Sequence, residues 1–314
     1  MPVDGSTPLR HDPVMLAETL DLLAPAPGRA YADATGGGGG HSAAIWPLIQ
    51  PEGRLVIIDQ DAAALAIARK REALASADGT IVWAHANFSV LPDVLKQANI
   101  ARLDGGLLAD LGVSSFQFDD GPRGFSFSKD APLDMRMNSD GTGVTAATLL
   151  EEASEEELVQ ILSEYGEERL SKSIARELVA KRRQWPLRTT AELAALIENV
   201  YHRTLGRPRG RIHPATQTFQ ALRIAVNDEL GSLRQLLGAL PACLAPGARA
   251  VIISFHSLED RLVKRAFRDG SRPGPHGEAT HWRLLTPKPL RPSKAEVAAN
   301  PRARSARLRA VEAI

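Results

Sequence analysis

Short, mainly apolar runs alternate with helix-like segments along the first 110 residues of the chain. Between the runs, apolar residues recur at helical spacing, most clearly over residues 61–75, where Asp61 is the expected N-cap. Strands that alternate with helices predict βαβ units and therefore a parallel sheet. The four runs with the length and composition of buried strands are residues 30–34, 54–58, 80–84 and 105–109.

A different pattern begins after residue 115. Residues 121–143 are rich in Gly, Asp, Phe and Met without a sustained period, and three helical patterns follow, at residues 151–165, 169–184 and 189–200. The last helix opens with Thr189-x-x-Glu192, the spacing of a capping box. Because no strand pattern interrupts this stretch, it predicts an all-helical insertion.

The α/β pattern resumes toward the C-terminus. A long helix is predicted from about residue 215 to 240, a strand over residues 250–254, and a last strand within residues 305–311. The expected fold is α/β, with a Rossmann-like, mostly parallel sheet and an inserted all-helical domain. We predict a first part of the core at residues 1–118, the insertion at 119–212, and a second part of the core with a basic tail at 213–314.

Composition places the chain among ordinary globular proteins. Its 314 residues, 44% hydrophobic and 24% charged, are enough to bury a sizeable core. The single cysteine, Cys243, excludes an internal disulfide and a multi-cysteine zinc site. Since no apolar run approaches the roughly 18 residues of a membrane span and residues 1–10 are polar, we expect a cytoplasmic protein without a membrane anchor.

The net charge of +1 hides an uneven distribution. From Arg261 to the C-terminus there are 13 lysines and arginines against 4 acidic residues. Such a distribution is typical of a surface that faces a polyanion, and equally of a solvated basic face, so both interpretations stay open. Four further arginines lie around a Pro-containing link before the long helix: Arg203, Arg207, Arg209 and Arg211.

A run of five glycines follows the first predicted strand, in the segment Asp33-Ala-Thr-Gly-Gly-Gly-Gly-Gly-His41. Taken alone, it fits a flexible loop as well as a loop whose backbone approaches a ligand closely. Asp59 ends the second strand, 20 residues after Gly39, where a carboxylate in a nucleotide-binding sheet accepts the ribose hydroxyls. The loop and the spaced acid together predict a cofactor that contains adenosine.

Two classes of adenosine cofactor are compatible with this loop, dinucleotides and S-adenosylmethionine. A dinucleotide requires G-x-G-x-x-G with a helix N-terminus under its pyrophosphate, but Ser42 stands at the third glycine position. Asp33 would also repel a pyrophosphate, whereas a sulfonium cofactor carries no phosphate. We therefore predict S-adenosylmethionine as the cofactor and a methyltransferase as the class of enzyme.

The ends of the later strands carry further candidates. Asn87 and Phe88 follow the third strand, where an adenine ring would lie, although Phe88 is equally compatible with a core residue. Asp110 ends the fourth strand and Ser114 follows it, which puts an acid and a hydroxyl at the crevice where a methyl group would be transferred. His256 follows the fifth strand, as a base, a stacking group or a phosphate contact, or as the cap of the next helix.

Nine long motifs occur in order over nearly the whole chain. They are His11-Asp-Pro-Val-Met15, Gly38-Gly-Gly-His-Ser42, Asp110-Leu-Gly-Val-Ser-Ser115, Arg123-Gly-Phe-Ser-Phe127, Pro132-Leu-Asp-Met-Arg-Met137, Tyr165-Gly-Glu-Glu168, His213-Pro-Ala-Thr216, Ser254-Phe-His-Ser-Leu-Glu-Asp-Arg261 and Asn300-Pro-Arg-Ala-Arg-Ser305. With these motifs the chain resembles the bacterial 16S rRNA cytosine-N4 methyltransferases, called RsmH or MraW. Motifs of this length and order are highly specific.

The resemblance implies a class I S-adenosylmethionine methyltransferase that acts on N4 of a P-site cytidine in 16S rRNA of the small ribosomal subunit. Three positions depart from the family pattern, since Gly36 replaces a bulky apolar residue, Phe116 a proline and Gln217 a basic residue. By position, the implied cofactor contacts are Gly38, Gly39, Gly40, His41, Asp59, Phe88, Asp110 and Gln117.

Methylation of an amine by a sulfonium needs mainly alignment, because the methyl group is already strongly electrophilic. We expect Asp110 and Ser114 to be the catalytic residues, with Asp110 accepting hydrogens of N4, and we expect no metal. The target base must leave its stack, and the flanking phosphates need cationic partners. The residues expected to contact the RNA are Phe125, Phe127, His256, Arg207, Arg209 and Arg211.

Three alternatives differ in chemistry or in class. Methylation at carbon 5 of cytosine needs a cysteine nucleophile in the cleft, and Cys243 precedes the fifth strand. An RNA-binding ribosome assembly factor with a vestigial cofactor fold fits the same motifs, but intact Asp33, Asp59 and Asp110 favour the enzyme. An NAD-dependent dehydrogenase is a distant third. The oligomeric state, a homodimer included, stays open.

Overall fold

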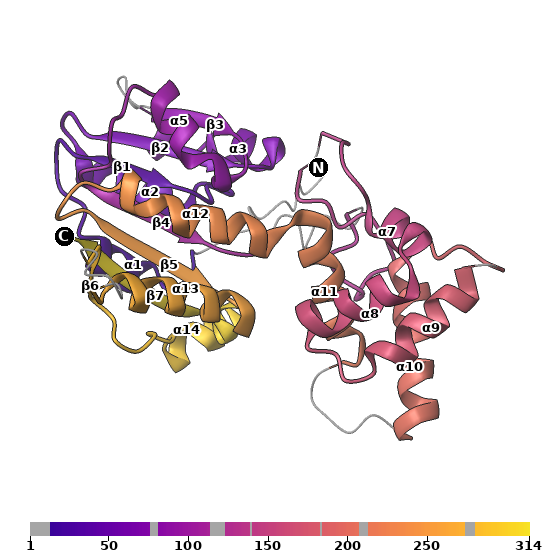
Figure 1. Cartoon of the computed structure of the whole chain (residues 1–314). Coiled ribbons are helices and arrows are strands. Elements are labelled where there is room, and N and C mark those ends of the chain that lie inside the picture. Colours follow the sequence, from indigo (N-terminus) through magenta and orange to yellow (C-terminus); the bar gives the residue numbers. More distant parts are fainter. Residues whose placement is uncertain are drawn as a thin grey trace, which may run out of the picture. The chain divides into compact units, whose positions relative to one another are not determined.

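The computed structural model describes residues 13–75, 81–113, 123–138, 140–182, 184–206, 213–273 and 280–314. The chain divides into two compact units, whose elements are labelled in Figure 1. The sheet unit comprises Met1–Asp59, Ala63–Gly112 and Leu236–Ile314. The helical unit comprises Gln60–Ala62 and Val113–Gln235.

Among the described residues, the sheet unit holds one seven-stranded sheet of order β3-β2-β1-β4-β5-β7-β6. Its strands are β1 Ala30–Asp33, β2 Arg54–Asp59, β3 Ile81–His85, β4 Gly106–Asp110, β5 Arg249–Ser254, β6 Trp282–Leu284 and β7 Arg307–Ala313. β1 to β5 are parallel, whereas β7 runs antiparallel to both β5 and β6. The predicted α/β class with a mostly parallel sheet is confirmed.

The strand order reverses between β1 and β4, which is where open α/β sheets bind ligands at the carboxyl ends of their strands. β1 is buried at all four positions and β4 at its first four, as expected for strands in the middle of a parallel sheet. Because Asp33 pairs in register with Leu108, Asp110 lies two residues further toward that edge. The sheet therefore brings both acids to its switch point.

Short helices connect the strands of the sheet unit. The predicted helix over residues 61–75 is two helices, with a break at residues 69–71. The helices are α1 Leu16–Leu23, α2 Gly40–Ile45, α3 Ala62–Ala68, α4 Glu72–Ala75, α5 Leu91–Gln97, α13 Ser257–Gly270 and α14 Lys294–Ala299, with 3-10 turns η1 Trp46–Ile49, η2 Phe88–Val90 and η4 Pro301–Ser305.

The described residues of the helical unit form helices and no strand. The helices are α7 Ala146–Glu152, α8 Glu155–Gly166, α9 Ser171–Arg182, α10 Thr190–Leu205 and α11 Ala215–Asn227. The predicted capping box at Thr189 and Glu192 is present, and a second one at Ser154 and Glu157 starts α8. That second box divides the helix predicted over residues 151–165 in two. Nowhere in the described chain is a helix both long and apolar enough to cross a membrane.

The predicted helix over residues 215–240 is also divided, into α11 and α12 Glu229–Cys243. Asp228 adopts a left-handed conformation, with φ of 44°, and ends α11 there. Phe219 and Leu222 of α11 are buried in the core of the helical unit. This packing places the boundary of that unit after residue 235, whereas the sequence pattern predicts it at 212.

Candidate cofactor and catalytic site

The glycine loop joins β1 to α2 and packs closely against the helix that follows β2. Gly37 and Gly39 have left-handed φ angles of 51° and 76°, which favour glycine. A Cβ atom on Gly39 would lie 2.9 Å from the Cβ of Ala68 in α3. The Gly37 amide donates to Asp59 Oδ2 at 2.7 Å, and the Arg71 Nε donates to the Gly38 carbonyl. The loop is therefore fixed from both sides, without room for side chains at Gly39.

The packing of Gly36 shows what a side chain at this position would meet. Its amide donates to the Ile58 carbonyl at 2.7 Å, so the loop lies against the end of β2. A Cβ on Gly36 would overlap Cγ2 of Ile57. Because Ile57 is fully buried, its side chain fills the space that a side chain at position 36 would take.

Asp33 fastens the two sides of the glycine loop to each other. Its carboxylate accepts hydrogen bonds from Ser42 Oγ at 2.6 Å and from the Thr35 amide at 3.2 Å, and the residue is 1% exposed. Burial raises the pKa of the Asp33 carboxyl above its usual range. Asp33 thus braces β1 against α2 and presents no surface to a ligand.

Asp110 and His41 meet at the switch point of the sheet. His41 Nε2 lies 3.5 Å from Asp110 Oδ2, and the Asp110 amide donates to Thr35 Oγ1 at 2.6 Å. Among the described residues, Asp110 Oδ1 and both ring nitrogens of His41 are buried without a hydrogen-bond partner. Buried polar atoms are nearly always satisfied, so such a cluster points to a ligand that completes it. These atoms are the most distinctive chemical feature of the sheet edge.

Asp59 and Phe88 continue the same edge toward β3. Asp59 is partly exposed, and its Oδ2 is the atom that receives the Gly37 amide. Phe88 opens the 3-10 turn η2 directly after β3 and is half-buried, while the side chain of Asn87 caps that turn by accepting from the Ser89 amide at 2.9 Å. The aromatic ring is therefore held at the strand end where an adenine ring is expected.

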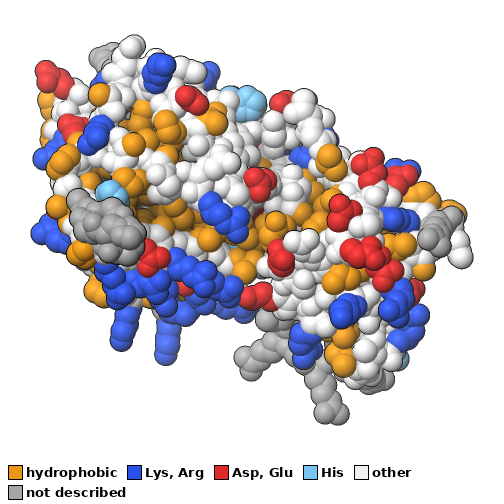
Figure 2. Space-filling model, viewed as in Figure 1, with side chains coloured by type: hydrophobic (Ala, Val, Ile, Leu, Met, Phe, Trp, Pro, Cys, Tyr) orange, Lys and Arg blue, Asp and Glu red, His pale blue; other side chains and the backbone are white. Residues whose placement is uncertain are grey.

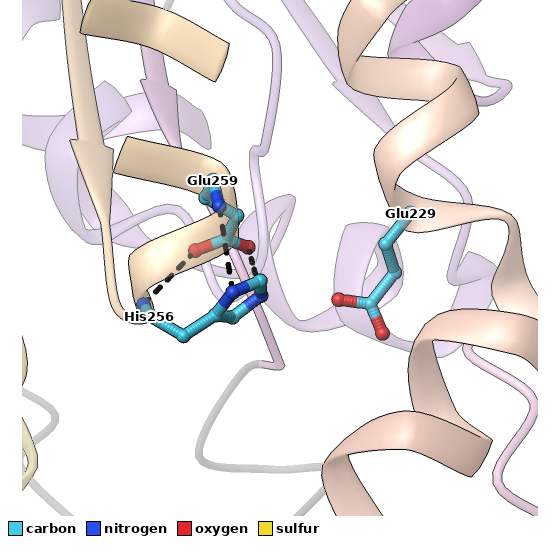
Figure 3. Close-up of side chains that lie close together, drawn as sticks. All are labelled: Glu229, His256 and Glu259. Carbon is cyan, nitrogen blue, oxygen red and sulfur yellow. Dashed lines mark hydrogen bonds and ion pairs between the residues drawn. The ribbon is translucent and has the colours of Figure 1, made fainter. Parts of the chain in front are cut away.

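His256 acts as the N-cap of α13 and lies beyond β5 (Figure 3). Its Nδ1 accepts from the Glu259 amide at 3.4 Å, and Glu259 Oε2 accepts from the amides of Phe255 and His256. The geometry favours the cap among the alternatives that the sequence leaves open for this histidine. Glu229, also drawn in Figure 3, forms an ion pair with Arg223 at 2.7 Å.

The two phenylalanines that we expected to hold a base lie in the helical unit. Phe125 is 6% exposed and belongs to the core of that unit, so it offers no face to a ligand in this structure. Phe127 is half-buried, stacks on His213 with ring centroids 4.4 Å apart, and meets Phe219 edge-on at 5.0 Å. Both rings contribute to packing, and Phe127 keeps part of its surface accessible.

Comparisons with known proteins assign the chain to a family. The model of the MraW methylase family matches residues 8–314. The chain belongs to this family. Two curated relatives, each called ribosomal RNA small subunit methyltransferase H, are 46% identical in Magnetococcus marinus and 48% identical in Geobacter sulfurreducens, with 96% of this chain and 98% of each relative covered. The expected enzyme class, a methyltransferase that uses S-adenosylmethionine, is confirmed.

A solved rRNA methylase from Streptococcus thermophilus is also similar to this MraW methylase. The match covers 95% of both chains, with 9% identity and a TM-score of 0.43. At that score it adds nothing to the assignment, and the fold rests on the strand order of the sheet itself.

Several expected site residues of the MraW methylase lie outside the described residues. They are the catalytic candidate Ser114, the cofactor candidate Gln117 with its neighbour Phe116, and the substrate candidates Arg207, Arg209 and Arg211. Their roles stay predictions. Gln217, the third departure from the family pattern, lies in the first turns of α11, where its side-chain amide donates to the Glu167 carbonyl at 3.4 Å.

Cys243 lies at the opposite edge of the sheet from Asp110. It ends α12, and its carbonyl accepts from the amide of Leu103, which precedes β4. The side chain is buried, and burial raises the pKa of its thiol. A buried thiol at the amino ends of the strands is poorly placed and poorly ionised for nucleophilic attack.

The basic C-terminal region divides into internal and exposed charges. Arg309 is 7% exposed and shares Asp260 with Arg307, so these two arginines stabilise β7 internally. Helix α13, in contrast, exposes a basic row at helical spacing, and Lys and Arg side chains gather on that part of the sheet unit in Figure 2. The row consists of Arg261, Lys264, Arg265 and Arg268.

Sequence reasoning missed the contacts that hold the site together. The direct approach of His41 to Asp110, the hydroxyl of Thr35 under the Asp110 amide, and the contact of Arg71 with the glycine loop all join residues distant in sequence. One signal was available, because Thr35 and His41 flank the glycine run within the same motif.

Proposed function

We propose that this MraW methylase transfers the methyl group of S-adenosylmethionine to N4 of a P-site cytidine in 16S rRNA of the small ribosomal subunit. The single observation that carries the proposal is the Asp110–His41 pair, with its unpartnered buried atoms at the switch point of the sheet. The names of the relatives support a small-subunit rRNA substrate, which would place the protein in the cytoplasm. The choice of base and atom rests on the family resemblance.

The sheet unit supplies a coherent set of groups for the cofactor. The glycine loop offers backbone at Gly38, Gly39 and Gly40 beside His41, Asp59 offers its carboxylate to ribose hydroxyls, and Phe88 offers a ring to adenine. The close packing of Gly39 on Ala68 fixes the loop backbone that is proposed to contact the amino-acid end. Gln117 is proposed from the family resemblance alone.

Asp110 is proposed to orient the amine that is methylated. S-adenosylmethionine supplies an electrophilic methyl group on a sulfonium. The N4 lone pair is delocalised into the ring, so the amine must become pyramidal to attack. Asp110 Oδ1, which is buried without a hydrogen-bond partner among the described residues, is proposed to accept one of its hydrogens. A new N–C bond forms as the S–C bond breaks, and the surplus proton leaves through Asp110 or water. Ser114 is proposed as a second acceptor.

The RNA would be held mainly through its phosphates. The exposed basic row of α13 follows the end of β5, and exposed cations at helical spacing suit a backbone of regular charge. Arg207, Arg209 and Arg211 are proposed as further phosphate contacts, and the accessible part of Phe127 as a stacking surface. Binding to small subunits should therefore weaken steeply as salt rises, and insensitivity to salt would contradict this electrostatic part.

Methyl transfer to small subunits tests the proposal directly. Subunits from a strain without this protein are incubated with the enzyme and methyl-labelled S-adenosylmethionine, and the nucleosides are separated and identified by mass spectrometry. We expect label in N4-methylcytidine of 16S rRNA at one position. Label in another base or atom would overturn the assignment, and a protein that binds subunits without transferring label would support the assembly-factor alternative.

A Cys243→Ser variant separates N4 methylation from methylation at carbon 5. Carbon-5 chemistry requires a cysteine that forms a covalent bond with the base, so it would be abolished. Attack by the N4 amine uses no thiol, so we expect the variant to keep its rate of methyl transfer. The measurement is the same labelled assay, and loss of transfer in a folded variant would contradict N4 methylation.

A further inference from the structure

Trp185 exposes an aromatic ring that the helical unit does not use for packing. The residue is 63% exposed, in the link between α9 and α10. The remaining tryptophans are better covered, since Trp46 and Trp282 are 6% and 4% exposed and Trp83 lies under the guanidinium of Arg69. An exposed indole contributes little burial free energy to folding, so its ring is available for contact with a ligand.

The exposed ring is held in a defined orientation. Its backbone amide donates to the Lys181 carbonyl at 2.9 Å, and its indole Nε1 donates to Glu192 Oε1 at 3.4 Å. Glu192 is itself fixed, because its other oxygen accepts from the amides of Arg188 and Thr189 at the start of α10. The edge of the ring is thus tied to a helix terminus, so little conformational entropy is lost when a ligand covers its face.

Exposed cationic residues lie on the link and on the segments bonded to it. Lys181, Arg188 and Lys129 are all exposed, on the segments that contain or directly pair with the link. The neighbouring acids, Asp130 and Glu192, direct carboxylate oxygens to backbone amides of α10 at Ala191, Thr189 and Arg188. The three exposed cations outnumber these two carboxylates on the same segments.

The same link supports the segment that carries Phe127. Thr190 and Ala131 are joined by two hydrogen bonds, of 2.8 and 3.0 Å, and the Leu133 amide donates to the Arg188 carbonyl at 3.0 Å. The exposed indole and the accessible part of Phe127 therefore belong to neighbouring, directly bonded segments of one unit. This continuity ties Trp185 to the surface proposed above for RNA.

We propose that Trp185, flanked by Lys181 and Arg188, forms a stacking platform for an unpaired base of the RNA substrate. An aromatic face with adjacent cations is the arrangement that binds single-stranded nucleic acid, because the base stacks on the ring while the flanking phosphates meet the cations. A duplex keeps its bases stacked on each other and offers no free face. The identification of the RNA as ribosomal rests on the proposed function.

The test uses the full-length protein and labelled single-stranded oligoadenylate, with anisotropy of the label measuring affinity and indole fluorescence reporting contact with the ring. Stacking on Trp185 should quench its emission, and Trp185→Phe serves as the blank that retains an aromatic ring. We expect Trp185→Ala to weaken binding of the oligonucleotide about tenfold, Trp185→Phe to keep most of the affinity, and binding of a duplex of the same length to be unaffected. Leu205→Ala, which removes another exposed side chain of the helical unit, is the matched control and should change nothing.

Methylation of small subunits with the same variants separates this inference from the proposed function. We expect Trp185→Ala to raise KM for subunits with kcat and the affinity for S-adenosylmethionine unchanged. Equal RNA affinity and equal KM in wild type and Trp185→Ala would overturn the platform and leave the methyltransferase proposal intact. Quenching by RNA without methyl transfer in the wild type would support the platform and overturn the methyltransferase proposal. A change of sedimentation in Trp185→Ala without a change in RNA affinity would assign the ring to a second copy of the chain, against the platform.

Discussion

The predicted site residues of the two units differ in how they are packed and hydrogen-bonded. In the sheet unit, Asp110 and His41 have buried polar atoms at the ends of the strands that no described residue satisfies. In the helical unit, Phe125 is part of the core and Phe127 is packed on two neighbouring rings. Side chains at the carboxyl ends of the strands lie next to loops and can contact a ligand. An aromatic residue beside helices is readily buried in their core. Position in the fold therefore decides which of these predicted side chains are packed into a core.

The largest effect should come from the sheet edge. We expect Asp110→Asn to lower the rate of methyl transfer by about a thousandfold, because the asparagine side chain still accepts a hydrogen bond but is neutral and cannot take up the proton that N4 loses. Thermal stability should change little, since the backbone contact with Thr35 remains. Asp93→Asn, at an exposed position on α5, is the matched control. Near-normal turnover with unchanged cofactor affinity would rule out the proposed role.

The next effect concerns the helical unit and stability. Replacing the buried ring in Phe125→Ala should cost about 3–4 kcal/mol in the free energy of unfolding, measured with denaturant. Phe125→Leu should recover most of the lost stability and should bind RNA with wild-type affinity. If Phe125→Leu were stable but bound small subunits weakly, the ring would have a role in RNA binding, and the contrast between the units would fail.

A smaller effect is expected within the glycine loop. Gly39→Ala combines a left-handed φ with an approach of 2.9 Å to Ala68, so it should destabilise the protein by about 2 kcal/mol and weaken binding of S-adenosylmethionine. Gly28→Ala is the control, because Gly28 has the same φ of 76° outside the glycine loop and its Cβ would meet nothing within 4 Å. Calorimetric titration of the two variants gives the comparison, and equal cofactor affinity would show that the loop tolerates displacement.

The smallest effect is a dependence of stability on pH. Burial raises the pKa of Asp33 above that of the unfolded chain, so the folded state retains this proton to higher pH. The contribution of Asp33 to stability is therefore complete below the unfolded pKa and is lost as pH rises through the folded pKa. Asp33→Asn does not titrate, so its thermal midpoint should rise relative to wild type from about pH 4 upward. A difference between the two proteins that stays constant with pH would contradict the shift.

Much of the fold followed from local patterns in the sequence. The strands β1 to β5 and the capping box of α10 lie where hydrophobic spacing and Thr189-x-x-Glu192 predict them. β6 was missed because it has three residues with little apolar pattern, and its pairing with β7 is a tertiary contact. The breaks near residues 153 and 228 were missed because helical spacing continues across them.

The candidate site could be predicted at the level of strand ends and no further. The alternation of strand and helix implies that Asp33, Asp59 and Asp110 share one edge of the sheet. It does not reveal that Asp33 turns inward to Ser42 while Asp110 turns toward His41, because side-chain direction depends on packing around the loop. The different surroundings of Asp33 and Asp110 could therefore be recognised only in the structure.

The packing of Ile57 against Gly36 has a consequence for chimeric enzymes. A glycine loop grafted from a relative with a bulky residue at position 36 would collide with the buried side chain of Ile57 on β2. The graft should succeed when Ile57 is shortened in the same step, as in Gly36→Phe combined with Ile57→Ala. The loop and strand β2 should therefore be exchanged together in a chimera.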